Sequence, residues 1–221
     1  FNNSTYINFR NITIRSTGTT DAWVAHFLDG SNNTIKNCVI EITGAGATAT
    51  NSNMAAVVVN GNATTMSTAS TVSSNNTIDS CTLNAGYYSV YATINASSNL
   101  LNITNSALNS AYYYGFYGVN PFSLRLKGNT INVRNATTST QSVYLQSLNN
   151  SGTDYFEVSG NIISSPGAYG IYMNSCSNSG SNYNLIYNNM IGGGFRNLSS
   201  TYGMYLTCLL YTSPSPRDKR Q

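Results

Sequence analysis

Five tyrosines recur at the same place in a short phrase between residues 88 and 206. In each phrase an apolar residue directly precedes the tyrosine; these residues are Val90, Phe116, Val143, Ile171 and Met204. Because side chains alternate between the two faces of a strand, inward apolar residues would place the tyrosines on the outer face. A row of rings offers apolar area with a polar hydroxyl, which suits the binding of sugar rings. The candidate ligand-binding residues are Tyr91, Tyr117, Tyr144, Tyr172 and Tyr205.

The same row of tyrosines has a purely structural explanation. Tyrosine is enriched in strands, and rings on adjacent strands stabilise a sheet by cross-strand pairing. This explanation needs no ligand, and we favour it over carbohydrate binding.

Carboxylates that could catalyse hydrolysis are scattered. Glycoside hydrolysis needs two carboxylates that face each other across the bond. The acidic residues before position 208 are never adjacent and suggest no such pair: Asp21, Asp29, Glu41, Asp79, Asp154 and Glu157. The densest segment holds Asp21, Trp23, His26 and Asp29, which a loop and a buried strand explain equally well. We therefore name no catalytic residue.

The cysteines and the single histidine do not form a metal-ligand pattern, since there is no CxxC and no Cys/His cluster. Cys38 and Cys81 occupy the same place in successive repeats. Neighbouring strands lie about 4.8 Å apart, whereas the Cβ atoms of a relaxed disulfide lie about 3.8 Å apart. We expect stacked, buried, free thiols and no cofactor.

These side chains must be positioned by a repeating backbone, because a second phrase returns seven times. It places an apolar residue two positions before an anchor and an apolar residue three positions after it. The anchors are Asn11, Asn37, Ser80, Asn105, Gly128, Gly160 and Asn188. These residue types tolerate a left-handed backbone, so we expect a tight bend at each anchor. A repeat of 20 to 50 residues is typical of a solenoid.

The residues next to each anchor form two further columns. Those after it change from apolar to amide, with Cys38 and Cys81 followed by Asn129, Asn161 and Asn189. We expect them to point inward and the stacked amides to satisfy one another. Those before it, among them Lys36, Asp79, Lys127 and Tyr187, are expected to form an ordinary solvated face. The Ser/Thr-rich stretch 60–76 is expected to be a loop that leaves one coil.

The repeat resembles the parallel β-helix repeat family over residues 1–207. Tyr169-Gly170-Ile171-Tyr172 followed by Asn184-Leu185-Ile186-Tyr187-Asn188-Asn189-Met190-Ile191 looks like large secreted bacterial surface proteins that carry such repeats. The resemblance implies an all-β, right-handed parallel β-helix of about seven coils. Some β-helices cleave acidic polysaccharides, but the motifs of pectate lyases and polygalacturonases are absent here.

Residues 208–221 resemble a translated sequencing-library adapter and are expected to be non-native. The chain starts at Phe1 without a Met, so we expect the helix to be truncated at both ends. Without this tail the formal net charge falls from +3 to about +1, which leaves no basic stripe for nucleic acid. No apolar run is long enough for a membrane span.

Three functions remain open. The sequence favours a secreted or surface-displayed structural or adhesive module and leans against enzyme activity, with the tyrosine row as its candidate binding site for extracellular polysaccharide or a cell-surface glycan. A spacer section without a ligand is a second possibility. The alternative is a β-helix polysaccharide lyase or glycoside hydrolase whose catalytic coil is absent or unrecognised.

Overall fold

The computed structural model describes residues 1–48, 50–96, 99–134, 139–164, 167–192 and 201–207. The adapter-like segment 208–221 lies outside the described residues. The described chain contains no apolar helix of the length that a bilayer crossing requires.

Three seven-stranded sheets, parallel throughout, stack the chain into a β-helix, which confirms the predicted all-β solenoid. The first sheet contains β1 (Asn8–Arg10), β4 (Thr34–Lys36), β7 (Asn76–Asp79), β10 (Leu100–Thr104), β13 (Ser123–Lys127), β17 (Phe156–Ser159) and β21 (Leu185–Tyr187). The second contains β2 (Thr13–Ser16), β5 (Val39–Ile42), β8 (Thr82–Asn84), β11 (Ala107–Ala111), β14 (Thr130–Val133), β18 (Ile162–Ser164) and β22 (Met190–Gly192).

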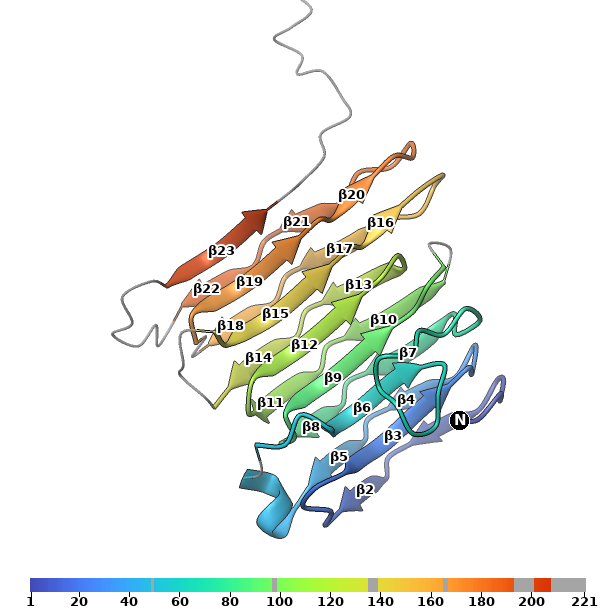
Figure 1. Ribbon diagram of the computed structural model, residues 1–221, viewed down its shortest axis with the longest axis vertical. Coiled ribbons are helices and arrows are strands. Elements are labelled where there is room, and N and C mark those ends of the chain that lie inside the picture. The colour runs from blue at the N-terminus through green and yellow to red at the C-terminus, as the bar shows by residue number, and fades with distance from the viewer. Residues whose placement is uncertain (49, 97–98, 135–138, 165–166, 193–200, 208–221) are drawn as a thin grey trace, which may run out of the picture.

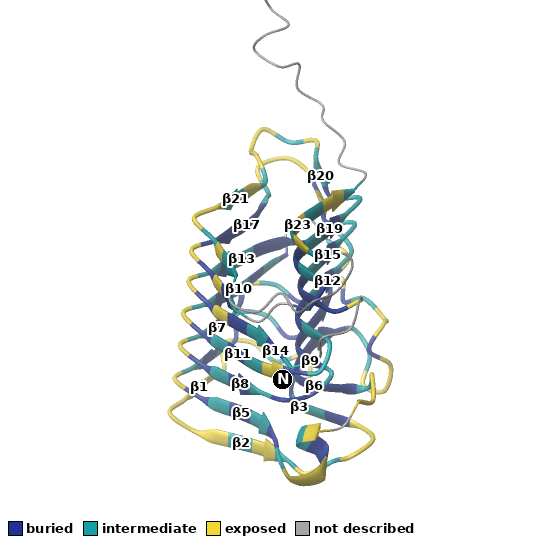
Figure 2. Cartoon of the chain, turned by 90° about the vertical axis from the view of Figure 1, so that its left-hand side faces the viewer, coloured by how far each residue is buried: buried dark blue, intermediate teal, exposed yellow. Residues whose placement is uncertain are grey.

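The third sheet faces the viewer in Figure 1. It contains β3 (Ala22–Leu28), β6 (Met54–Asn60), β9 (Tyr88–Thr93), β12 (Tyr114–Val119), β15 (Gln141–Gln146), β19 (Tyr169–Asn174) and β23 (Tyr202–Thr207). A short 3₁₀ helix, η1 (Gly44–Thr48), follows β5, and β16 (Asn149–Asn150) pairs with β20 (Ser177–Asn178). Figure 2 shows the first and third sheets as opposite walls of the coil, with their inner sides buried.

The bend between the first and second sheets lies at the predicted anchor of every coil. All seven anchors have a φ angle between 51° and 65°, which confirms the left-handed backbone expected from their residue types. Five of them are Asn or Ser, in which a short polar side chain is tolerated at this φ, and two are Gly. The anchor therefore turns the chain at the same point of each coil.

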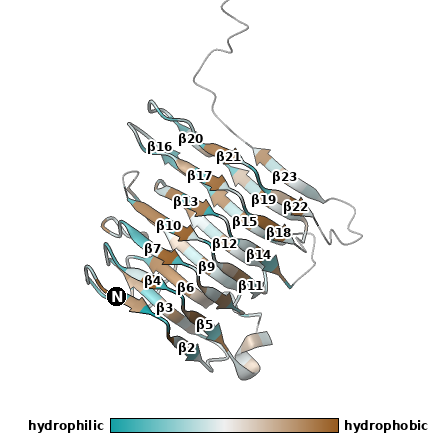
Figure 3. Cartoon of the chain, turned by 180° about the vertical axis from the view of Figure 1, so that it is seen from behind, coloured by the Kyte–Doolittle hydropathy of each residue, from teal (hydrophilic) through white to brown (hydrophobic). Residues whose placement is uncertain are grey.

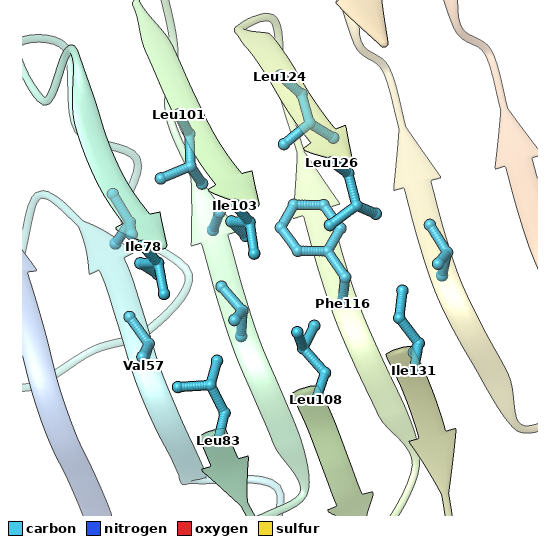
Figure 4. Close-up of a cluster of buried hydrophobic side chains, with 14 of the residues drawn as sticks. Val57, Ile78, Leu83, Leu101, Ile103, Leu108, Phe116, Leu124, Leu126 and Ile131 are labelled. Atoms are coloured by element: carbon cyan, nitrogen blue, oxygen red, sulfur yellow. The ribbon is translucent and has the colours of Figure 1, made fainter. Parts of the chain in front are cut away.

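Aliphatic columns fill the interior. Ile78, Ile103 and Leu126 of the first sheet and Leu83, Leu108 and Ile131 of the second are fully buried and belong to one core cluster. Figure 4 shows these side chains meeting Val57 and Phe116 of the third sheet between the walls. In Figure 3, strands such as β10 and β13 are largely brown, which marks hydrophobic residues, whereas many of the connecting bends are teal and hydrophilic. Burial of these columns supplies the main stabilising free energy of the coils.

The inward amide column has hydrogen-bond partners on both sides. Asn161 Oδ1 accepts from the backbone N–H and the side-chain amide of Asn129 at 2.9 and 3.0 Å. Asn189 Oδ1 does the same for Asn161 at 3.1 and 2.9 Å. The Nδ2 of Asn161 also donates to Leu126 O at 2.9 Å. The ladder thus satisfies backbone groups of the neighbouring coil as well as its own amides.

The thiols of Cys38, Cys81 and Cys176 are free and buried, as expected for the first two. Burial raises the pKa of Cys81 and of Cys176 to about 11, so both stay protonated thiols at neutral pH. Cys81 Sγ donates to Asp79 O at 3.3 Å. These cysteines act as small core residues.

Candidate functional site

The outer face of the third sheet carries nine tyrosines in two rows, which we call the tyrosine face. One row is the predicted set. The other lies three residues earlier in each coil and consists of Tyr88, Tyr114, Tyr169 and Tyr202. Gln141 occupies the corresponding place in β15.

The second row of tyrosines was missed because its spacing breaks strict alternation. In β9 both Ser89 and Val90 are fully buried, so two consecutive residues point inward and Tyr88 and Tyr91 share the outer face. The phrase Tyr-x-apolar-Tyr in β9, β12, β19 and β23 was the available signal.

The rings of the predicted row stack on one another along the molecule. Tyr117 and Tyr144 have ring centroids 4.8 Å apart and planes 9° apart, and Tyr144 and Tyr172 have centroids 5.3 Å apart and planes 16° apart. Carbon atoms make optimal contact at about 3.5–4.0 Å. Nearly parallel planes with these centroid distances must therefore be offset, as stacked aromatic pairs prefer. Each ring covers part of its neighbour's face, so the row is not a flat platform of fully open rings.

The N-terminal end of the tyrosine face is covered, which corrects the expectation that Tyr91 lies on an open outer face. Tyr91 is only 8% exposed. The predicted loop between β6 and β7 folds back over it, and Met66 packs against Val58 and Tyr91. Asn60 holds this loop by donating to Thr65 O at 2.9 Å and to Met66 O at 3.2 Å.

Beyond this loop the tyrosine face is open. Tyr117, Tyr144, Tyr172 and Tyr205 are half-buried. Burial raises the pKa of Tyr117 and of Tyr144 to about 12, which keeps both phenols neutral at physiological pH. Tyr144 Oη donates to Gln146 Oε1 at 2.7 Å. Met204, which precedes Tyr205, is 42% exposed because β23 is the outermost strand of its sheet and pairs only with β19.

The segment with Asp21, Trp23, His26 and Asp29 does not converge on a site. Trp23 and His26 extend the two tyrosine rows to β3, where their rings pack edge to face at 5.0 Å. His26 Nε2 lies 2.6 Å from Asn60 Oδ1, and burial lowers the pKa of His26. Asp21 bonds Asn53, and Asp29 accepts from Ser70 Oγ at 2.6 Å. The two carboxylates lie at opposite ends of β3 and support loops.

A second candidate surface is a groove of about 330 Å³ on the outer side of the bend between the first and second sheets. Two successive anchors are glycine here, so its floor at Gly128 and Gly160 has no side chains. The groove is lined by Thr104, Asn105, Lys127, Gly128, Ser159, Gly160, Tyr187 and Asn188.

Glu157 is the buried charge beside this groove, with a side chain only 5% exposed. It accepts from Tyr187 Oη at 2.6 Å and from Ser159 Oγ at 2.8 Å, and Lys127 Nζ lies 3.0 Å away. Burial acts to raise the pKa of Glu157, but these donors outweigh it and the pKa lies below its usual range. Lys127, Ser159 and Tyr187 belong to the column that precedes the anchors. At these positions the column makes specific bonds to Glu157, whereas the sequence predicted an ordinary solvated face.

Neither surface contains a metal-ligand set: the described residues hold no group of three or more His, Cys, Asp or Glu arranged to bind a metal ion. Glu157 lies beside the groove and is not one of its lining residues, and its oxygens already have several donors. Comparison of the chain with protein-family models, with curated proteins and with solved structures finds no match.

Proposed function

We propose that this β-helix is a module displayed outside the cell that binds an extended polysaccharide along the open part of the tyrosine face. The observation that carries the proposal is the uncovered run of half-buried rings at Tyr117, Tyr144, Tyr172 and Tyr205. Each ring combines apolar area with a hydroxyl, the combination that suits a sugar. The rings repeat once per coil, so a chain molecule lying along the rod axis meets one ring after another.

The composition supports a neutral ligand over a highly charged one. Only 8% of the residues are charged, and the open part of the tyrosine face is built of phenols. Binding would then depend on contact area and hydrogen bonds and would change little with salt. The slipped stacking leaves part of each ring face and the hydroxyl edge for the ligand.

The test is a glycan array with the triple variant Tyr117→Ser, Tyr144→Ser and Tyr172→Ser. Glycan binding by the parent protein and its loss in a variant that retains its circular dichroism spectrum are expected. The matched control is Tyr183→Ser, because Tyr183 is 73% exposed and lies outside the tyrosine face; it should bind like the parent. A parent protein that binds no glycan, or a folded triple variant that binds fully, would leave the spacer role as the function.

Polysaccharide cleavage is the second candidate function, and the groove beside Glu157, with Lys127 in its lining, is the observation that favours it. A lyase would generate unsaturated products that absorb ultraviolet light. Absorbance that grows with acidic polysaccharide and disappears in Lys127→Ala would support cleavage at this groove. No absorbance across a panel of such polymers would count against it.

A further inference from the structure

The tyrosine face forms a continuous chain of ring contacts from β9 to β23. In the predicted row the centroids of successive rings lie 5.0, 4.8, 5.3 and 5.3 Å apart. The second row joins it sideways, for example between Tyr114 and Tyr117 at 5.0 Å and between Tyr169 and Tyr172 at 5.2 Å. These contacts, which also stabilise the sheet by cross-strand pairing, run unbroken over five coils.

We propose that the tyrosine face is a site of oxidative coupling, at which hydrogen peroxide and a peroxidase join phenols of adjacent coils into dityrosine. Each of the two phenols loses one electron and one proton. A carbon–carbon bond then forms between two ring carbons, each of which is next to a hydroxyl-bearing carbon. The hydrogen on each of these coupled carbons moves to the oxygen when aromaticity is restored, so both hydroxyls are regenerated. Hydrogen peroxide takes up the two electrons and two protons and is reduced to two water molecules.

Geometry favours coupling between column neighbours. Tyr117 and Tyr144 are nearly parallel and come from paired positions of β12 and β15, so their hydroxyls project in the same sense. The unpaired electron of a phenoxyl radical lies in π orbitals perpendicular to the ring, so parallel, offset rings present their reactive carbons to each other, and the rings turn edge to edge only as aromaticity is restored.

Contact between the rings also allows half-buried phenols to be oxidised through an exposed one. Tyr202 is 41% exposed and its ring lies 5.6 Å from Tyr169 and 5.1 Å from Tyr205. An electron removed at this exposed ring can be replaced from the next ring inward, so the radical reaches Tyr172 and Tyr144 without direct access. Two radicals that meet in one row then couple.

The product would be a covalent link between coils. A bond from Tyr117 to Tyr144 closes a loop of 27 residues in the chain. Cross-links of this kind restrict the unfolded chain and thereby stabilise the folded one. Coupling should therefore raise the midpoint of thermal unfolding.

The experiment treats the whole chain at low concentration with hydrogen peroxide and a haem peroxidase. Trypsin and a glutamate-specific protease then cut between the coils, and mass spectrometry locates the cross-links. Intramolecular links from Tyr117 to Tyr144 and from Tyr144 to Tyr172 are expected to exceed links that involve Tyr6 or Tyr183. Exposure alone would give the opposite order, because Tyr6 is 76% and Tyr183 73% exposed.

The variant Tyr144→Phe keeps the ring stack and removes one phenol, so both links should vanish while a link from Tyr172 to Tyr205 persists. Tyr183→Phe is the matched control and should leave the map of column links unchanged. Links confined to Tyr6 and Tyr183, links only between molecules, or the same pattern in urea-unfolded protein would overturn the proposal.

Discussion

At the scale of single residues, the inward amide ladder is the feature that tolerates the fewest substitutions. Asn161 is fully buried, and its side chain bonds two backbone groups of the preceding coil, the N–H of Asn129 and the carbonyl of Leu126. A hydrophobic residue of similar size would fill the space but would leave the N–H of Asn129 and the carbonyl of Leu126 without these partners. Buried unpaired groups cost more than the mean value of a hydrogen bond.

Asn161→Leu should lower the free energy of unfolding by about 2–4 kcal/mol, the range of large single-site effects from broken buried networks. Urea denaturation followed by circular dichroism measures this. Asn132→Leu is the control, because Asn132 is only partly buried on the outer side of β14; its effect should stay within about 0.5 kcal/mol. Equal effects in the two variants would remove the ladder's special role.

Asp79 makes a contribution to the free energy of unfolding that depends on pH. Its carboxylate lies 2.7 Å from Lys36 Nζ and accepts from Thr104 and Asn105, and the Lys36 contact is the main cause that lowers its pKa to about 2. A depressed folded-state pKa stabilises the protein above the unfolded value of about 3.9, and this contribution is lost as pH falls towards 2. The ion pair is partly solvated, so the contribution should be about 1 kcal/mol.

The measurement compares wild type with Asp79→Asn at pH 5 and at pH 2. Wild type should be the more stable protein at pH 5, and the difference should shrink at pH 2, where Asp79 is partly protonated in the folded protein and fully protonated in the unfolded one. A difference that is constant across this range would mean that the charge of Asp79 does not contribute.

At the scale of the strand, the third sheet depends on one small residue per coil. The residue after the first tyrosine of the Tyr-x-apolar-Tyr phrase points inward against the second sheet. A Cβ atom added at Gly115 would lie 2.4 Å from Ile131 Cγ2 and 2.7 Å from Ser142 O. Ser89 and Ser142 occupy the same column and their hydroxyls are buried. The column is small because the two sheets come close together there.

Gly115→Ala should therefore destabilise the protein by about 1–3 kcal/mol, the usual cost of overpacking. Gly203→Ala is a control in the same column, because a Cβ at Gly203 would meet nothing within 4 Å. Thermal unfolding of both variants tests this. Equal destabilisation by the two alanines would show that backbone freedom matters here and that packing does not.

At the scale of the whole molecule, stability should be distributed unevenly along the rod. Central strands pair on both sides, whereas β1, β2 and β23 pair on one side only, and Phe9, Ile12 and Leu206 are 41, 39 and 46% exposed. In a repeat protein each unit contacts only its neighbours, so the outer coils open first.

Amide hydrogen exchange should accordingly be slowest in β9, β12 and β15 and fastest in β1, β2 and β23. Mass spectrometry of peptides after short exchange times provides the profile. Uniform protection along the rod would contradict neighbour-by-neighbour stability and would indicate one cooperative unit.

The sequence predicted the coil more completely than it predicted the surface. Asn11, Asn37 and the other anchors were found because a left-handed bend restricts residue type at one position. The tyrosine row was found because one ring recurs per coil. The cover over Tyr91 was not, since the loop that carries Met66 belongs to one coil alone. The hydrogen-bonded cluster around Glu157 was also missed. Its partners Lys127 and Tyr187 come from the coils on either side, so no local sequence motif marks them.

The bend at the anchors also has a consequence at the level of the gene. Every coil offers its two neighbours the same corner, so an in-frame duplication of one coil would supply a unit with fitting partners on both sides. Loss of one coil would likewise join two corners of the same shape. Recombination can therefore change the length of this rod with little structural cost, whereas point mutations in the corner and amide columns disturb contacts between coils.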